Sequence, residues 1–524
     1  MGAVRYIGLP ADLPLCARAY DMYDTSNGEG KRDDNERGVL AVEVLKNFVG
    51  GGPVAVEAGE ELEVPDPATG ELLGRVPLSG AEDVDRAVQV AARAFEEWRE
   101  EPVTRRARRM FKLQVLLEEH LEELAELCTR ENGKHVDESK GEIWRGIEVV
   151  ELAASMTTLM KGETLDGVSP GVDVALHREP LGVVAGVTPF NFPMMIPLWF
   201  APLAIATGNA FILKPSQRTP LSAMRLADLF SEAGFPDGVF NVVHGARETV
   251  EALIDHPQVE AISSVGGSEA ARNIYKRAAE RGKRVQALGG AKNHIVVMPD
   301  ADLEAAAQGV FSSAFSNGGQ RCLAGSVGVA VGGIGDELVE RLAKVAGEAQ
   351  IGSGLNREMD SGTSLTPVTS AEAKEKISGW ISRGEEEGAR LVVDGRAYEE
   401  DEGFFLGPTI FDRVTPEMEI AREEIFGPVL AVERMEDLDE AIRTINESRY
   451  GNAAAIFTRD GAAARKFRRE VECGMIGINI SVPAPVAFFP FTGWKDSFFG
   501  DLHATGRDGV EFYTERKVVI ERWR

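Results

Sequence analysis

The sequence predicts an α/β protein built from two doubly wound domains. Short β-rich runs alternate with helical runs between residues 181 and 290, and a second alternating series runs from residue 293 to about residue 480. A chain of 524 residues is also longer than one hydrophobic core usually organises. Such alternation indicates parallel sheets with helices packed on them, an architecture that binds nucleotides.

The N-terminal third begins with residues 1–43, which are polar and which we expect to form an extension without regular structure. Residues 64–77 have strand-like ends around a turn, which is typical of a hairpin. Apolar residues then recur every three or four positions from 84 to 98 and again from about 104 to 130. We expect two amphipathic helices, the second ending at Asn132-Gly133.

The first alternating series opens with an uncharged run from Leu181 to Leu213, long enough to suggest a membrane span. Four prolines and two asparagines interrupt this run, so we interpret it as a buried strand, turn, helix and strand. Further elements of the two series are expected at 221–234 (helix), 238–245 and 259–267 (strands), 268–282 (helix), 283–290 and 293–298 (strands), 303–315 (helix), and 326–333 and 517–523 (strands).

Charge and cysteine usage narrow the function classes. With 84 acidic and 57 basic residues the net charge is −27, which argues against binding to nucleic acid or an anionic membrane and favours small-molecule substrates. The four cysteines are far apart and form no CxxC pair, so we expect neither a disulfide framework nor a metal site: Cys16, Cys128, Cys322 and Cys473. No secretory signal is evident, and we expect a cytoplasmic protein.

Cys322 lies in the stretch SNGGQRCLAGS, residues 316–326, between Arg321 and a run of small residues. A cysteine becomes a nucleophile when a positive charge, a helix dipole or backbone amides favour its thiolate. Arg321 is adjacent, and two preceding glycines permit close approach of other groups. Taken alone, a cysteine after arginine is more often a buried structural residue, so these residues by themselves leave both interpretations open.

Five motifs in a fixed order favour the catalytic interpretation of Cys322. Through them the chain, from about Lys46 to Trp523, resembles the aldehyde dehydrogenase superfamily. The motifs are TPFNFP (188–193), LKPS (213–216), GGQRC (318–322), EEIFGPV (423–429) and GINI (477–480). Three further stretches resemble the CoA-acylating methylmalonate-semialdehyde dehydrogenases of that superfamily rather than its hydrolytic members: GAKNH (290–294), FFPFTGWKDSFFGDLHATG (488–506) and EFYTERKVV (511–519).

The resemblance implies that Cys322 attacks an aldehyde, giving a thiohemiacetal that passes hydride to a nicotinamide and becomes a thioester. It also implies that the side-chain amide of Asn191 and the Cys322 backbone N–H hold the oxyanion, and that Phe192 lines the substrate site. Arg145 and Arg321 match arginines associated with the substrate carboxylate, which a planar guanidinium can bind at two points. Without the resemblance, Asn191 would be interpreted as a turn former and Arg145 as a helix-surface ion-pair partner.

The cofactor positions also follow from the resemblance. Lys214 matches the lysine at the adenosine ribose, Glu424 the glutamate on the nicotinamide ribose, and Phe426 the ring beside it. The glutamate that commonly grips the ribose hydroxyls is Gln217 here, so NAD is favoured but NADP is less strongly excluded. Gly267 occupies a place where the family often has serine near the pyrophosphate, but Gly266 and Gly267, which open a helix, can still offer backbone N–H groups to phosphate. Taken alone, a double glycine usually marks only a turn. The full predicted set is Thr188, Phe190, Lys214, Gln217, Gly266, Gly267, Leu288, Glu424 and Phe426.

Leu288 is the most informative departure from the family. Hydrolytic members carry a glutamate 34 residues before the cysteine, where this chain has Leu288. Water, with a pKa of about 15.7, needs that base, whereas a thiol with a pKa of about 8.5 supplies some thiolate at neutral pH. A thiol acceptor such as CoA therefore tolerates leucine, unless another carboxylate substitutes as the base.

We therefore predict an NAD-dependent, CoA-acylating dehydrogenase that converts methylmalonate or malonate semialdehyde to propionyl-CoA or acetyl-CoA with loss of CO2. One alternative is a hydrolytic dehydrogenase of another semialdehyde, such as succinate semialdehyde; another is a binding or structural protein that kept the fold. By resemblance we expect homodimers or tetramers. The expected division is a dinucleotide-binding domain (44–160 and 181–289), a catalytic domain (290–480), and a small β oligomerisation arm with a C-terminal strand (161–180 and 481–524).

Overall fold

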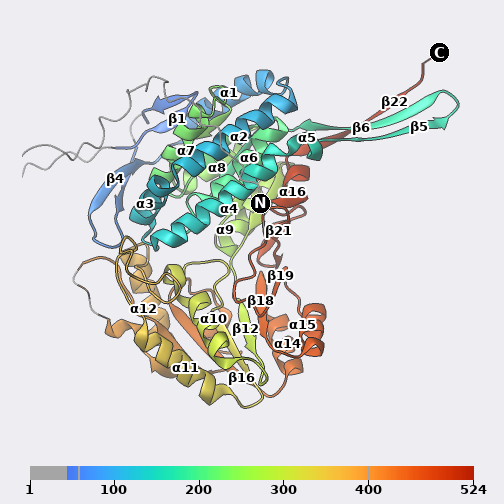
Figure 1. Cartoon of the computed structure of the whole chain (residues 1–524). Coiled ribbons are helices and arrows are strands. Elements are labelled where there is room, and N and C mark those ends of the chain that lie inside the picture. Colours follow the sequence, from blue (N-terminus) through green and yellow to red (C-terminus); the bar gives the residue numbers. More distant parts are fainter. Residues whose placement is uncertain (1–43, 57–58, 399, 401, 524) are drawn as a thin grey trace, which may run out of the picture. The chain divides into compact units, whose positions relative to one another are not determined.

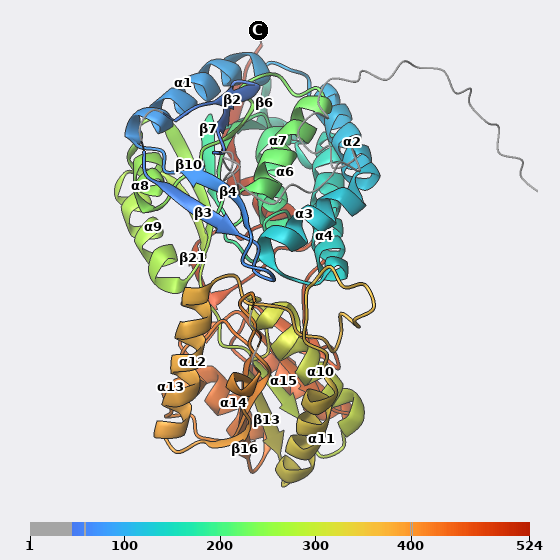
Figure 2. The same ribbon diagram turned by 90° about the vertical axis from the view of Figure 1, so that its left-hand side faces the viewer.

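The computed structural model describes residues 44–523 except 57, 58, 399 and 401. The extension expected over residues 1–43, which includes Cys16, lies outside the described residues. Within the described part of the chain the strands form five sheets, and the two largest are covered by helices (Figures 1 and 2). The predicted α/β fold class is confirmed.

The larger sheet has eight strands in the order β2-β1-β9-β8-β7-β10-β11-β21. Its five central strands, from β9 to β11, are parallel. The chain runs outward from β7 through β8 and β9 on one side and through β10 and β11 on the other, so the order reverses beside β7. The strands are β1 (Asn47–Val49), β2 (Gly52–Val54), β7 (Val183–Val187), β8 (Ala210–Lys214), β9 (Phe240–Val242), β10 (Val259–Val265), β11 (Arg284–Leu288) and β21 (Phe498–Gly500).

Alternate side chains of this sheet enter two different cores. Val183 and Ala185 of β7 pack with α1, α8 and α9, whereas Val184 packs with the helices on the opposite face, α2, α3, α4, α6 and α7. The helices are α1 (Ala81–Trp98), α2 (Val103–Glu119), α3 (Leu121–Asn132), α4 (Val136–Ala154), α5 (Met156–Leu159), α6 (Met195–Thr207), α7 (Leu221–Glu232), α8 (Arg247–Asp255) and α9 (Ser268–Glu280).

One of two expectations about the helices of this region is wrong, and the other is confirmed. The single helix expected from about 104 to 130 is wrong, because the chain leaves helical geometry at His120 (φ −97°, ψ 12°) and forms α2 and α3 instead. The apolar run after Leu181 does form a strand, a helix and a strand, and every residue of α6 is buried. No helix in the described ranges is long and apolar enough to cross a membrane.

The second sheet has seven strands in the order β14-β15-β16-β13-β12-β18-β19, and all but β14 are parallel. Ile295 of β12 packs with α10 and α11 on one face, and Val296 packs with α14 and α15 on the other. The strands are β12 (His294–Val297), β13 (Val327–Val331), β14 (Arg390–Val393), β15 (Thr409–Val414), β16 (Val429–Met435), β18 (Ala453–Phe457) and β19 (Met475–Ile478). The helices are α10 (Leu303–Phe315), α11 (Gly335–Glu348), α12 (Ala371–Glu386), α13 (Glu419–Arg422), α14 (Leu438–Glu447) and α15 (Gly461–Glu470).

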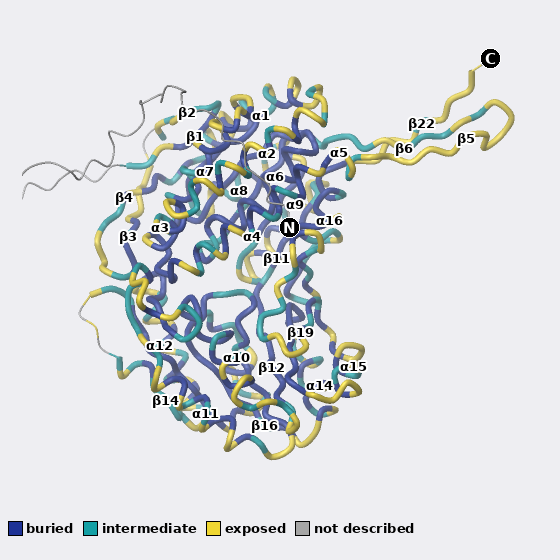
Figure 3. The backbone as a smooth tube through the Cα atoms, viewed as in Figure 1, coloured by how far each residue is buried: buried dark blue, intermediate teal, exposed yellow. Residues whose placement is uncertain are grey.

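A three-stranded arm stands away from the two sheets and is exposed along most of its length (Figures 1 and 3). It consists of β5 (Glu163–Ser169), β6 (Val172–Pro180) and β22 (Thr514–Glu521). The C-terminal β22 pairs antiparallel with β6 of its own chain, from Thr514 opposite Pro180 to Glu521 opposite Asp173.

The rest of the C-terminal segment packs elsewhere: β21 joins the eight-stranded sheet, and α16 (Gly506–Phe512) contacts α6. The remaining strands form two small sheets, a hairpin of β3 (Glu61–Pro65) with β4 (Leu72–Pro77) and a pair of β17 (Tyr450–Gly451) with β20 (Trp494–Lys495). The division into a cofactor domain, a catalytic domain and an oligomerisation arm stays a prediction.

Candidate active site

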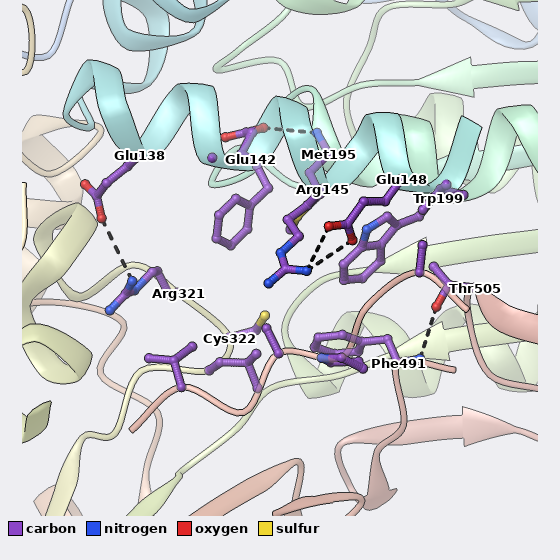
Figure 4. A pocket seen from close by; sticks show the side chains of 18 of the residues that line it. Glu138, Glu142, Arg145, Glu148, Met195, Trp199, Arg321, Cys322, Phe491 and Thr505 are labelled. Carbon is purple, nitrogen blue, oxygen red and sulfur yellow. Dashed lines mark hydrogen bonds and ion pairs between the residues drawn. The ribbon is translucent and has the colours of Figure 1, made fainter. Parts of the chain in front are cut away.

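A cavity of about 270 Å³ lies between α4, the start of α6 and the loop that carries Cys322 (Figure 4). We call it the Cys322 cavity. Its walls include four residues that the sequence predicted for catalysis or substrate binding, namely Arg145, Phe192, Arg321 and Cys322. These four predicted residues, which are up to 177 positions apart in the chain, therefore meet at one site.

The backbone before Cys322 is tightly constrained. Gly319 has φ +69°, and a Cβ there would lie 2.2 Å from the carbonyl oxygen of Gly427, so only glycine fits. The carbonyl oxygen of Cys322 accepts hydrogen bonds from the side-chain amides of Asn293 (2.9 Å) and Asn452 (2.8 Å). These contacts hold the half-buried cysteine in a defined orientation.

Burial, together with the negative charge of Glu424, raises the pKa of the Cys322 thiol to about 12. The backbone amides of Cys322 and Leu323 and the charge of Arg321 act in the opposite direction but do not outweigh burial. In the unliganded site the sulfur is therefore protonated at neutral pH. The same amides point at the sulfur, where they can also stabilise an oxyanion.

Asn191 lies next to the Cys322 segment without lining the cavity directly. Its side chain is buried, and its amide nitrogen donates a hydrogen bond to the carbonyl oxygen of Gln320 at 3.0 Å, two residues before the cysteine. A side-chain amide has two donor hydrogens, so this contact uses one and leaves one for a ligand.

The two predicted substrate arginines have different surroundings. Arg145, from α4, turns its guanidinium into the cavity toward Cys322, and its Nη1 lies 3.1 Å from each carboxylate oxygen of Glu148 (Figure 4). Arg321 donates to the carbonyl oxygens of Ser312 (2.7 Å) and Ser313 (3.1 Å), and burial lowers its pKa. Arg145 is the more accessible of the two to a ligand.

The predicted cofactor residues gather at the carboxyl ends of adjacent parallel strands. Thr188 follows β7, Lys214 ends β8, Gly266 follows β10 and Leu288 ends β11. The strand order reverses beside β7, and dinucleotides bind in the crevice at such a reversal. Burial lowers the pKa of Lys214 to about 8. The structure thus brings these four residues to one edge of the sheet.

The start of α9 suits a phosphate. Gly267 precedes the 13-residue helix, and a Cβ at Gly266 or Gly267 would meet nothing within 4 Å, so the space around their backbone is open. Helix N-termini present free N–H groups and a favourable dipole to anions. Gln217 lies half-buried in the turn after β8, near the end of the strand that carries Lys214. These residues fit a dinucleotide.

The segment around Phe190 follows β7 of the eight-stranded sheet, and the segment around Glu424 precedes β16 of the seven-stranded sheet. The two segments are in contact. The rings of Phe190 and Phe426 contact edge to face, with 5.9 Å between centroids. Glu424 accepts a hydrogen bond from the Ala291 backbone N–H at 2.9 Å, and burial raises its pKa to about 7. Leu288 is buried and pairs in register with Phe498 of β21.

Several cavity residues were not anticipated from the sequence. Glu138 and Glu142 share one face of α4 with the predicted Arg145, spaced four and three residues apart. Lys134, Glu148, Asn317 and Thr505 add further polar groups to the lining. Polar residues at this spacing on a largely buried helix were the available signal. Across the described ranges, no group of three or more His, Cys, Asp or Glu side chains could hold a metal ion.

Comparison with known proteins gives a consistent result. The model of the aldehyde dehydrogenase family matches residues 54–519. Malonate-semialdehyde dehydrogenase 1 of Geobacillus kaustophilus (strain HTA426) is 58% identical over 482 residues, covering 92% of this chain and 98% of the relative. The crystal structure of methylmalonate-semialdehyde dehydrogenase from Oceanimonas doudoroffii matches with a TM-score of 0.89 and 46% identity, covering 92% of this chain and 99% of that chain. A proposed methylmalonate-semialdehyde dehydrogenase from Sinorhizobium meliloti 1021, solved with NAD, matches with a TM-score of 0.90 and 43% identity over 93% and 99% of the two chains.

Proposed function

Because this chain belongs to the aldehyde dehydrogenase family, we propose that it is an NAD-dependent, CoA-acylating dehydrogenase of malonate or methylmalonate semialdehyde. The products are acetyl-CoA or propionyl-CoA, with loss of CO2. One observation carries the proposal: Cys322 and the guanidinium of Arg145 open into the same cavity, while Leu288 supplies no carboxylate. Each of the relatives described above is named for one of these two substrates.

Binding of the substrate begins with its carboxylate at Arg145, which turns the aldehyde carbon toward Cys322. The Cys322 sulfur then forms a bond to that carbon as the S–H bond breaks and the thiol proton passes to water. The carbonyl oxygen becomes an oxyanion, which the Asn191 amide and the Cys322 N–H stabilise. Thr188, Lys214, Gly266, Gly267 and Glu424 would hold NAD, which would supply the acceptor for the hydride that this carbon loses as the thioester forms.

The resulting acyl thioester on Cys322 carries a β-carboxylate. Breaking the bond to that carboxylate releases CO2 and leaves its electron pair as an enolate on the thioester oxygen, where the same two donors stabilise it. The enolate carbon then takes a proton. The thiolate of CoA attacks the acyl carbon, the bond to the Cys322 sulfur breaks, and the cysteine is regenerated as the acyl-CoA leaves.

A hydrolytic dehydrogenase is the second candidate, and one observation favours it. The pKa of Glu424 is raised to about 7, close to that of an effective general base, and its charge acts on Cys322. Glu424 would then activate water in place of the carboxylate missing at position 288. Glu424 also has a role in holding the cofactor, so in this assignment one side chain would both bind the cofactor and act as the general base.

The two candidates differ in their need for CoA. Steady-state NADH formation from malonate semialdehyde with and without CoA is the decisive assay. We expect turnover to fall at least about tenfold without CoA, because water is a poor acceptor without a base. Turnover that is undiminished without CoA, and lost in Glu424→Gln, would reject the acylating enzyme in favour of the hydrolytic one.

The assembly and the setting of the enzyme are also part of the proposal. The exposed arm, with its terminal strand β22, supports a homodimer or homotetramer. The net charge of −27 supports action on free small molecules rather than on nucleic acid or membrane surfaces. The wide spacing of the cysteines supports a reducing, cytoplasmic setting.

A further inference from the structure

Glu142 of α4 holds the start of α6 through one carboxylate oxygen. Its side chain is fully buried, and its Oε1 accepts hydrogen bonds from the backbone N–H groups of Met194 (2.8 Å) and Met195 (3.0 Å). Because α6 begins at Met195, these are otherwise unsatisfied donors of the first turn. Glu142 therefore fixes the C-terminal end of the segment that carries Asn191 and Phe192.

The other carboxylate oxygen of Glu142 pairs with Lys134, and Lys134 holds the opposite end of the same segment. The Lys134 ammonium donates to the backbone carbonyl oxygen of Asn191 at 2.5 Å and lies 4.5 Å from the centre of the Phe192 ring. Asn132, two residues earlier, donates to the carbonyl oxygen of Phe190 at 2.9 Å. Two consecutive carbonyl groups are thus held by the end of α3 and the short connection to α4.

From this arrangement we propose that Lys134 and Glu142 are positioning residues: together they hold the side-chain amide of Asn191 where the oxyanion forms on Cys322. A buried ion pair contributes little to stability compared with apolar residues of similar volume, so stability alone does not require one here. The proposal rests on the proposed function only in taking Cys322 as the nucleophile and Asn191 as the oxyanion donor.

The test separates positioning from stability with three variants: Glu142→Gln, Lys134→Met and the double variant. Glu142→Gln keeps an acceptor oxygen for Met194 and Met195 but loses the ion pair. Lys134→Met leaves an unpaired buried carboxylate, and the double variant is neutral at both positions. For each, stopped-flow absorbance measures NADH formed in the first turnover with saturating aldehyde and NAD, without CoA, and a thermal melt gives Tm.

Glu131→Gln is the matched control. Glu131 is also a buried glutamate that accepts two backbone N–H groups at a helix start, from Leu221 (2.7 Å) and Ser222 (3.0 Å) of α7, and it does not line the Cys322 cavity. Its loss is expected to lower Tm while the first-turnover rate stays within about twofold of the parent. Alkylation of Cys322 by iodoacetamide checks that the nucleophile itself is unchanged in every variant.

We expect the first-turnover rate to fall about 10- to 100-fold in both single variants, with a smaller change in aldehyde KM, because displacing a catalytic group by 1 Å can cost that much. In the double variant Tm should recover while the rate stays low. A double variant that regains the parent rate with its Tm, or a control that slows as much as Glu142→Gln, would overturn the proposal. The first turnover precedes acyl transfer, so a parent enzyme that proved hydrolytic would refute the acylating function and leave this comparison intact.

Discussion

Arg145 and Glu148 lie one helical turn apart on α4, and a single guanidinium nitrogen of Arg145 is 3.1 Å from both carboxylate oxygens of Glu148 at the Cys322 cavity. The contact uses Nη1 and leaves the other nitrogens of the guanidinium for a second carboxylate. Glu148 thus orients the arginine, and its negative charge also opposes an anionic substrate. The side chains are 41% and 31% exposed, so water screens part of that opposition.

Replacing Arg145 should separate substrates by charge. In Arg145→Ala we expect kcat/KM for malonate semialdehyde to fall about 10- to 100-fold, the worth of a charge-assisted hydrogen bond, and that for propanal to change less than about threefold. Steady-state kinetics on both aldehydes measure the difference. Glu148→Gln is the companion variant, and its KM for the anionic aldehyde should fall slightly. Equal losses on both aldehydes in Arg145→Ala would show that the arginine does not bind the carboxylate.

The reactivity of Cys322 should rise steeply with pH in the unliganded enzyme. Its pKa is raised to about 12 by burial first and by Glu424 second, so the reactive thiolate is scarce at pH 7 and grows about tenfold per pH unit. Iodoacetamide alkylation followed from pH 7 to 10 should show this rise without a plateau. Glu424→Gln removes a charge that is present mainly above pH 7, so it should accelerate alkylation more at pH 9 than at pH 6. A plateau below pH 8 would contradict the raised pKa.

Cofactor preference should respond to position 217. The residue lies in the turn after β8, where a glutamate would grip ribose hydroxyls and repel a 2′-phosphate. Gln217→Glu should therefore raise KM for NADP about tenfold or more and leave KM for NAD nearly unchanged. Gln217→Met, which has no charge, serves as the control. If both variants discriminate equally, the charge is not the cause.

The exposed face of the arm should control assembly. Val518 and Ile520 of β22 are 59% and 69% exposed and share one face, because they are two residues apart on a strand. In the proposed homo-oligomer this apolar face of β22 lies against another copy of the chain. Replacing both with aspartate should lower the mass measured by sedimentation velocity, whereas Lys517→Ala should not. An unchanged mass in the double aspartate variant would exclude the arm as the contact.

Much of the fold could be predicted because burial leaves a pattern in the sequence. The uncharged run after Leu181 became β7, α6 and β8 in the expected order, since side chains on both faces of this sheet are buried. Apolar spacing likewise located α1. The break between α2 and α3 at His120 could not be seen, because no proline or glycine marks it and the apolar spacing continues on both sides.

The site was less predictable, because its geometry depends on contacts between distant residues. Motifs identified the segments around Asn191, Cys322 and Glu424, but nothing local to Asn452 indicates that its amide would hold the Cys322 carbonyl from 130 residues away. Nor does the sequence around Glu142 reveal that its carboxylate would accept a hydrogen bond from the backbone N–H of Met194. Such roles arise only after folding brings the elements together.

Restoring a carboxylate at position 288 gives the sharpest test of the acyl acceptor. Leu288 is 5% exposed at the end of β11, so a glutamate there would be desolvated and its pKa raised toward neutrality, as a general base requires. Leu288→Glu should increase NADH formation without CoA at least about tenfold and lower Tm. Leu288→Gln is matched in size and polarity but cannot take a proton, so its activity without CoA should stay at the parent level. If the glutamine variant gained as much as the glutamate variant, access of water rather than a missing base would explain a dependence of the parent enzyme on CoA.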